Sequence, residues 1–111
     1  MITDLNYLKT MSDGDSRFIS EMVELFREQI GEYNEQMPEL VRNGDYDSLA
    51  KLAHKAKSSV AVMGMTQVAE LLKELEILAN DRKEVDRYES MVNHFLQQSQ
   101  LALEELDEET T

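Results

Sequence analysis

Residues 85–106 read VDRYESMVNHFLQQSQLALEEL, and this stretch decides the fold. Its apolar and small residues recur in alternating steps of three and four: Val85, Tyr88, Val92, Phe95, Ser99, Ala102 and Leu106. Such steps place side chains along one stripe of an α-helix, and a stripe this narrow is typical of helices that pack in bundles. The stretch therefore predicts a long helix with a single buried seam.

The chain before residue 85 divides by the same periodicity into a short leader and three more long segments. The leader, at about residues 3–11, offers a small apolar patch of Leu5 and Leu8. The segment ending at about residue 43 has its stripe at Phe18, Met22, Leu25, Phe26, Ile30, Tyr33, Met37 and Leu40. The next two segments, at about residues 46–63 and 66–79, have stripes at Leu49, Leu52, Ala53, Ala56, Val60 and Met63, and at Val68, Leu71, Leu72, Leu75, Leu78 and Ala79.

Residues that favour helix ends lie between these segments. Three of them are expected to be N-caps: Asp15, Asp45 and Thr66. Gly44 and Gly64 suit the left-handed position after a helix, and residues 80–84 form a charged turn. Pro38 lies inside the second segment and removes one backbone donor, so we expect a local kink near residues 34–37 rather than a break.

Composition supports an all-α domain. The 111 residues include only four glycines and one proline, whereas residues that favour helix are abundant. Four long helices joined by short turns predict an antiparallel up-down-up-down four-helix bundle with a short extra N-terminal helix. Residues 1–111 are expected to form one domain, with an acidic tail at about residues 107–111 that frays.

Charge and the missing residue types exclude several classes of function. The formal net charge is −12, from 23 acidic and 11 basic residues, so nucleic acid and anionic membranes are disfavoured as partners. The absence of cysteine excludes disulfides, thiolate metal sites and thiol nucleophiles. The N-terminus has neither a basic leader nor a long apolar run, and a cytoplasmic location is therefore expected.

Two histidines are the candidates for a reactive site, and helical geometry separates them. His54 projects roughly 150° from the centre of its segment's apolar stripe, so it is expected to face solvent in the middle of a helix. Its neighbours on that surface are short or basic: Ala50, Lys51, Lys57, Ser58 and Ala61. No acidic residue occurs between Asp47 and Glu70, while Lys51, Lys55 and Lys57 do. Another protein could therefore approach the imidazole of His54 closely, whereas His94 lacks such surroundings and is assigned no role.

The residues from 53 to 65, AHKAKSSVAVMGM, resemble the signature of the histidine-containing phosphotransfer (HPt) domain family of two-component phosphorelays. In that signature a histidine is followed by lysine at plus three, a small residue, serine, and glycine at plus ten. The matching positions are His54, Lys57, Ser58, Ser59 and Gly64. The similarity extends over about residues 4–80. One departure is Ser58, where the family usually has glycine.

The resemblance implies that His54 accepts a phosphoryl group from a receiver-domain aspartate and passes it to another receiver. It implies that Lys57 stabilises the phosphoryl charge, and that the partners are response-regulator receiver domains and a hybrid histidine kinase. No cofactor is expected on this chain, because Mg²⁺ and most catalytic groups would belong to the receiver. The docking surface would comprise Ala50, Lys51, Lys55, Ser58, Ser59, Ala61 and Gly64.

Several alternatives stay open. The bundle could be a helical adaptor or a regulatory pseudo-HPt that binds receiver or kinase domains without being phosphorylated. Lys51 and Lys55 could belong to an ordinary solvated face. A two-histidine metal site is disfavoured, because no Glu-x-x-His pair points inward. The chain has no glycine-rich nucleotide loop, so it would be a phosphocarrier without autokinase activity, and its standing as an enzyme is undecided.

Overall fold

The computed structural model describes residues 3–110, without the side chains of residues 7, 11, 109 and 110. Every secondary-structure element in this range is helical: α1 (Asn6–Met11), α2 (Ser16–Asn43), α3 (Tyr46–Val62), α4 (Thr66–Asp81), the 3-10 turn η1 (Val85–Arg87) and α5 (Tyr88–Thr110). The predicted all-α class and the short N-terminal helix are confirmed.

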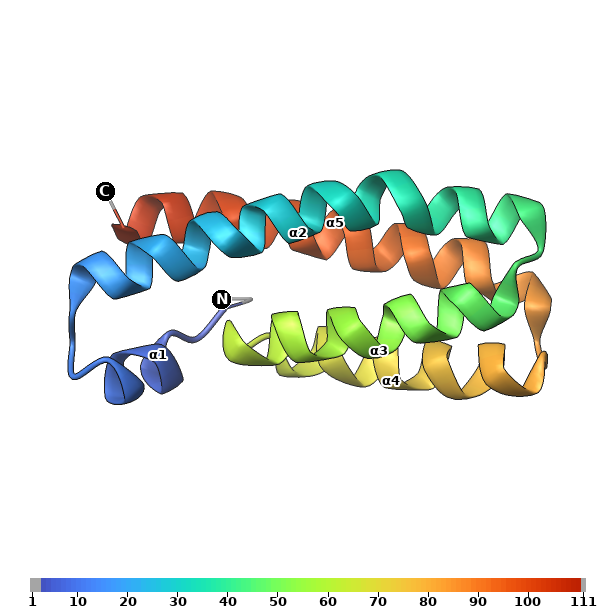
Figure 1. Cartoon of the computed structure of the whole chain (residues 1–111), viewed down its shortest axis with the longest axis horizontal. Coiled ribbons are helices and arrows are strands. Elements are labelled where there is room, and N and C mark those ends of the chain that lie inside the picture. Colours follow the sequence, from blue (N-terminus) through green and yellow to red (C-terminus); the bar gives the residue numbers. More distant parts are fainter. Residues whose placement is uncertain (1–2, 111) are drawn as a thin grey trace.

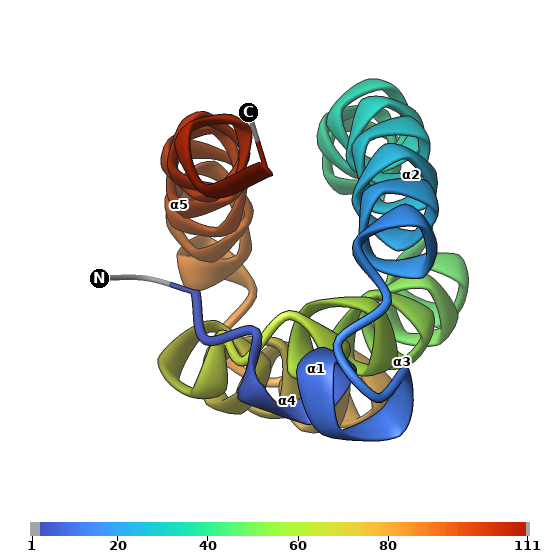
Figure 2. The same ribbon diagram turned by 90° about the vertical axis from the view of Figure 1, so that its left-hand side faces the viewer.

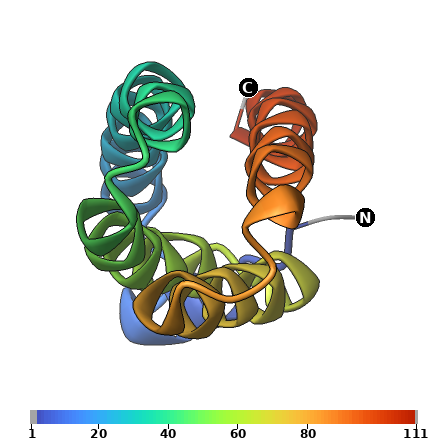
Figure 3. The same cartoon turned by 90° about the vertical axis from the view of Figure 1, so that its right-hand side faces the viewer.

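The four long helices pack around one core. In chain order, α2 and α4 extend from left to right in Figure 1, and α3 and α5 return. Viewed along the long axis, α3 and α4 lie side by side, with α2 next to α3 and α5 next to α4 (Figures 2 and 3). The short helix α1 lies at the end of the bundle where α3 passes into α4.

Most of the predicted helix ends are confirmed. The Asp15 carboxylate accepts hydrogen bonds from the backbone N–H groups of Arg17 and Phe18, and the Asp45 carboxylate accepts one from Ser48. Gly44 caps α2 in the left-handed conformation. The prediction for Thr66 is wrong, because the N-cap of α4 is Met65, which provides no side-chain cap. The backbone N–H of Ala69 donates to the carbonyl of Met65, so the helix begins one residue earlier than predicted.

The buried stripe of α2 differs in part from the predicted one. The buried side chains of this helix are Ile19, Val23, Phe26, Ile30, Tyr33 and Met37. They follow the same alternating steps of four and three as α5, because a narrow seam is sufficient where helices pack at bundle angles. Leu25, which was expected in the stripe, lies about 100° from Phe26 and is 45 % exposed. Helix α2 continues through Pro38 without a break.

Small residues on α3 allow this helix to pack closely against α4. Ala50, Ala53 and Ala56 are each at most 2 % exposed, and short side chains let two helix backbones approach closely. Helix α4 lies alongside, with Leu72, Leu75 and Ala79 fully buried. Longer side chains at the edge of this contact can therefore reach from one helix to the other.

The predicted seam of α5 is confirmed from Tyr88 to Leu106, whereas Val85 lies in η1 and is 36 % exposed. The tail that was expected to fray is helical as far as Thr110, and Thr111 lies outside the described residues. Arg27 of α2 forms an ion pair with Asp107 in this part of α5. Such a contact favours an ordered last turn.

The N-terminal segment connects the end of α5 to the α3–α4 turn. The backbone N–H and the hydroxyl of Thr3 both donate to the carboxylate of Glu105, at 3.1 and 3.0 Å. The next residue, Asp4, donates its backbone N–H to the carbonyl of Met63 at 2.9 Å. Leu5 and Leu8 bury their side chains in the core, as expected. This segment therefore covers one end of the bundle.

Candidate functional site

His54 lies in the middle of α3 with 64 % of its side chain exposed, which confirms the predicted outward projection. Its Nδ1 lies 2.9 Å from Oε2 of Glu76 on α4. An ionised carboxylate can only accept a hydrogen bond, so Nδ1 carries the proton in this pair. In the neutral imidazole, Nε2 then holds the free lone pair. Nε2 is then the ring nitrogen that is available to act as a nucleophile.

Lys57, one turn after His54, binds the other oxygen of the same carboxylate. Its Nζ lies 3.2 Å from Oε1 of Glu76, and its side chain is 29 % exposed. The two oxygens of Glu76 therefore fix one cation and one imidazole side by side. An ammonium group held beside the imidazole can stabilise negative charge that develops on a group bound to His54.

Partial burial of the Glu76 carboxyl group opposes its ionisation. The hydrogen bond and charge of Lys57, followed by those of His54, act in the other direction and lower the pKa of Glu76 below its ordinary value. Glu76 is therefore ionised near neutral pH. It is an acceptor for both neighbours under those conditions.

Glu76 was missed in the sequence analysis. The acid-free window between Asp47 and Glu70 describes α3 and its turn, but α4 brings a carboxylate into the same surface. A usable signal was present, because Glu76 directly follows the buried Leu75 and so lies at the edge of the α4 stripe. Choosing it would have required the register between α3 and α4, which a single helix pattern does not supply.

The predicted docking residues divide into exposed and structural ones. Lys51, Lys55, Ser58 and Ala61 are exposed on α3 around His54. Ala50 is 2 % exposed, so its assignment to the docking surface is wrong. The buried face of α3 is wider than one stripe, because α3 contacts both α2 and α4.

Ser59 and Gly64 also have structural surroundings. Ser59 is half-buried, and its hydroxyl lies 3.1 Å from the hydroxyl of Tyr33 on α2. Gly64 has a φ of +72°, and a Cβ atom there would lie 2.3 Å from the carbonyl oxygen of Asp4. The N-terminal segment thus covers Gly64, which requires glycine for backbone conformation and close packing. Gly64 therefore has a structural role in the turn; it is half-buried, and its place on the docking surface stays a prediction.

His94 is exposed on α5, a different helix from those that carry His54 and Glu76. Its side chain forms no hydrogen bond or ion pair with any residue in the described part of the chain. Among the described residues, no group of three or more His, Cys, Asp or Glu side chains is placed to hold a metal ion. The surroundings that could support chemistry are those of His54.

The family model of the Hpt domain matches residues 21–109, and the chain therefore belongs to the Hpt domain family. Domains of this family carry out histidine phosphotransfer in phosphorelays, and they interact with receiver domains and histidine kinases. No curated protein and no solved structure gives a significant match. In the described part of the chain, no helix has the length and apolar character needed to cross a membrane.

Proposed function

We propose that this protein is a phosphocarrier that accepts a phosphoryl group on Nε2 of His54 from a receiver-domain aspartate and passes it to a second receiver. One observation carries the proposal: an exposed imidazole is bound through Nδ1 by Glu76, and Glu76 also holds Lys57 beside it. This arrangement leaves Nε2 free, orients the ring and places a positive charge nearby.

The transfer step follows from these contacts. The lone pair of Nε2 attacks the phosphorus of the aspartyl phosphate, a P–N bond forms, and the P–O bond to the aspartate breaks. The carboxylate leaves with the bonding electrons, and the Nδ1 proton of His54 stays hydrogen-bonded to Glu76. Phosphoryl transfer depends mainly on positioning and electrostatic stabilisation, which Glu76 and Lys57 supply from this chain.

The rest of the machinery is assigned to the partners. We propose that Mg²⁺ is bound by the receiver, that a hybrid histidine kinase supplies the phosphoryl group, and that the transfer takes place in the cytoplasm. The chain would form one domain in which four long helices alternate in direction. This scaffold presents the middle of α3 to solvent, so that a receiver can approach His54.

The proposal is tested by incubating the protein with phosphorylated receiver domains and measuring label on the bundle. Acid-labile, base-stable label is expected on the parent protein, and no label is expected on His54→Gln. His94→Gln is the matched control and should label like the parent. Label that persists in His54→Gln would refute the assignment. Receiver binding without any label on the parent would instead favour a non-phosphorylated adaptor.

A further inference from the structure

A second ion pair connects α3 and α4 on the face that carries His54. Nη2 of Arg82, the C-cap residue of α4, lies 3.1 Å from Oδ2 of Asp47 in the first turn of α3. Asp47 precedes His54 by seven residues, which is about two turns and about 10.5 Å along the helix. The two side chains therefore project on the same side of α3.

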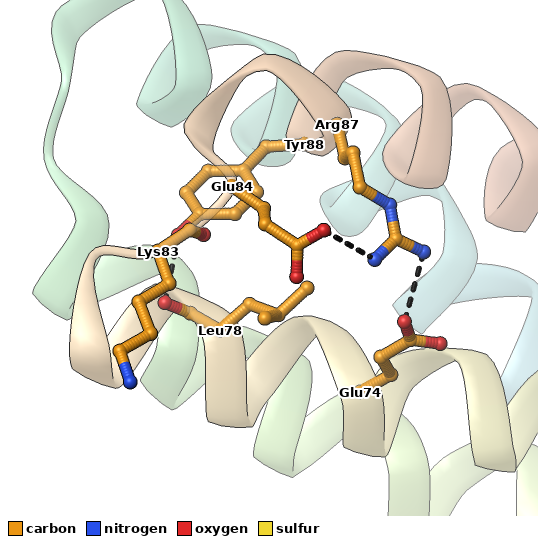
Figure 4. A network of polar contacts seen from close by, with 6 residues as sticks. All are labelled: Glu74, Leu78, Lys83, Glu84, Arg87 and Tyr88. Atoms are coloured by element: carbon orange, nitrogen blue, oxygen red, sulfur yellow. Dashed lines mark hydrogen bonds and ion pairs between the residues drawn. The ribbon is translucent and has the colours of Figure 1, made fainter.

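The backbone of Arg82 is in an unfavourable conformation. Its φ is +54°, and Glu84 two residues later has a φ of +52°, a region that residues other than glycine rarely adopt. Hydrogen bonds around Tyr88 hold this turn in place. The Tyr88 hydroxyl lies 2.7 Å from the carbonyl oxygen of Leu78 and 2.6 Å from that of Lys83 (Figure 4). Leu78 precedes Arg82 in the sequence, and Lys83 follows it.

Further contacts fix the same turn. Arg87 forms ion pairs with Glu74 at 2.8 Å and with Glu84 at 3.3 Å (Figure 4). The fold thus maintains a strained left-handed residue whose long basic side chain is directed toward α3. Arg82 and Asp47 are 63 % and 66 % exposed, and an ion pair between such exposed side chains adds little to the stability of the fold. Stability therefore does not explain why this arrangement is maintained.

We propose that Arg82 is a docking residue that exchanges its contact with Asp47 for a carboxylate on the rim of the receiver's active site. This inference rests on the proposed function, because it takes the receiver as the partner. A receiver interface that covers about 800 Å² of each partner extends about 16 Å from its centre. Centred on His54, such an interface includes the Asp47–Arg82 pair.

Charge complementarity selects an acidic rim as the binding partner. Lys51 and Lys55 are exposed beside His54 on α3, and Arg82 adds a third cation about two turns of α3 away, where it is paired with Asp47. The chain as a whole has a net charge of −12, so three exposed cations on the face of His54 are a local feature. Asp47 then acts as an internal competitor that holds Arg82 in place until the receiver's carboxylate replaces it.

The test compares the two partners of the ion pair. Arg82→Gly removes the side chain and suits the left-handed backbone, so it should fold at least as well as the parent. We expect it to slow association with the receiver by up to about fivefold at low salt, the upper end of the range for one exposed ion pair. Asp47→Asn frees Arg82 and should have the opposite effect, faster association. Stopped-flow association at two salt concentrations measures both.

Two controls separate docking from other effects. Glu84→Gly relieves the same kind of backbone strain in the same turn, and Arg17→Gln, at the start of α2, makes the same change in net charge as Arg82→Gly. Neither should slow association. Equal slowing by Arg82→Gly and Asp47→Asn, or parental rates in Arg82→Gly, would overturn the inference. Phosphoryl label on His54 is measured in parallel. If the parent protein binds the receiver but acquires no label, the result counts against the proposed function and not against docking by Arg82.

Discussion

Substitution of Gly64 by alanine tests how the N-terminal segment is fixed to the α3–α4 turn. The added Cβ would lie 2.3 Å from the carbonyl oxygen of Asp4 and 2.6 Å from its Cβ. Because these atoms include backbone, they cannot turn away as a flexible side chain could. The segment must move, and the hydrogen bond from the Asp4 N–H to the Met63 carbonyl would be lost with it.

Gly44 provides a matched control for this substitution. Its φ of +70° is close to the +72° of Gly64, but no atom beyond those of Gly44 and its two chain neighbours lies within 4 Å of the position that a Cβ would occupy. Gly44→Ala should therefore cost only the left-handed conformation, about 1 kcal/mol. Gly64→Ala adds the lost hydrogen bond and displaced apolar contacts, for a total of about 3 kcal/mol.

Thermal unfolding distinguishes these two costs. For a domain of this size, about 1 kcal/mol lowers Tm by about 5 °C, so Gly64→Ala should unfold roughly 15 °C below the parent and Gly44→Ala roughly 5 °C below it. Below its own Tm, the Gly64→Ala variant should still accept label on His54. Equal Tm values for the two variants would refute the close contact between Asp4 and Gly64. Normal stability with lost transfer would instead indicate that Gly64 acts in docking.

Four further substitutions test other parts of the structure. Ser99→Ala should raise the free energy of unfolding by about 1 kcal/mol in urea titrations, because the Ser99 hydroxyl is buried without a partner in the described part of the chain; a loss of stability would contradict this. Glu76→Gln should remove a pH-dependent part of the free energy of unfolding. Because the pKa of Glu76 is lowered in the folded protein, its ionised carboxylate stabilises the fold at pH values above the ordinary pKa of 4.5, and this contribution is lost as the pH falls through the lowered pKa. Parallel stability curves for Glu76→Gln and the parent across that range would refute the assignment. Ala61→Arg should fold normally and reduce transfer by up to roughly a hundredfold, whereas Ala50→Arg should unfold the bundle; parental transfer in Ala61→Arg would exclude this face of α3 as the docking surface.

The fold could largely be predicted from the sequence, because each helix has its own periodicity and its own end signals. The seam of α5 and the caps at Asp15 and Asp45 depend only on neighbouring residues, and they are confirmed. The errors in α2 have a different origin. Leu25 and Ile19 are both apolar, and only the direction from which α3 and α5 approach decides which of them is buried.

The candidate site could be predicted only as far as α3. The exposure of His54 and its closeness to Lys57 follow from positions on one helix. Glu76 joins them through the register of α3 against α4, and Gly64 is covered by a segment about 60 residues earlier in the chain. Contacts between distant segments depend on how the helices pack, which the pattern of a single helix does not contain. Ala50 was misplaced for the same reason, since α3 is buried on more than one side.

The position of the phosphoryl group on the imidazole of His54 tests the central claim most directly. Nuclear magnetic resonance of the ring nitrogens and of phosphorus in the labelled protein distinguishes attachment at Nε2 from attachment at Nδ1. Because the Nδ1–H group donates to Glu76, we expect phosphate on Nε2 and a proton retained on Nδ1. Phosphate on Nδ1 of His54, or on any residue other than His54, would contradict the account.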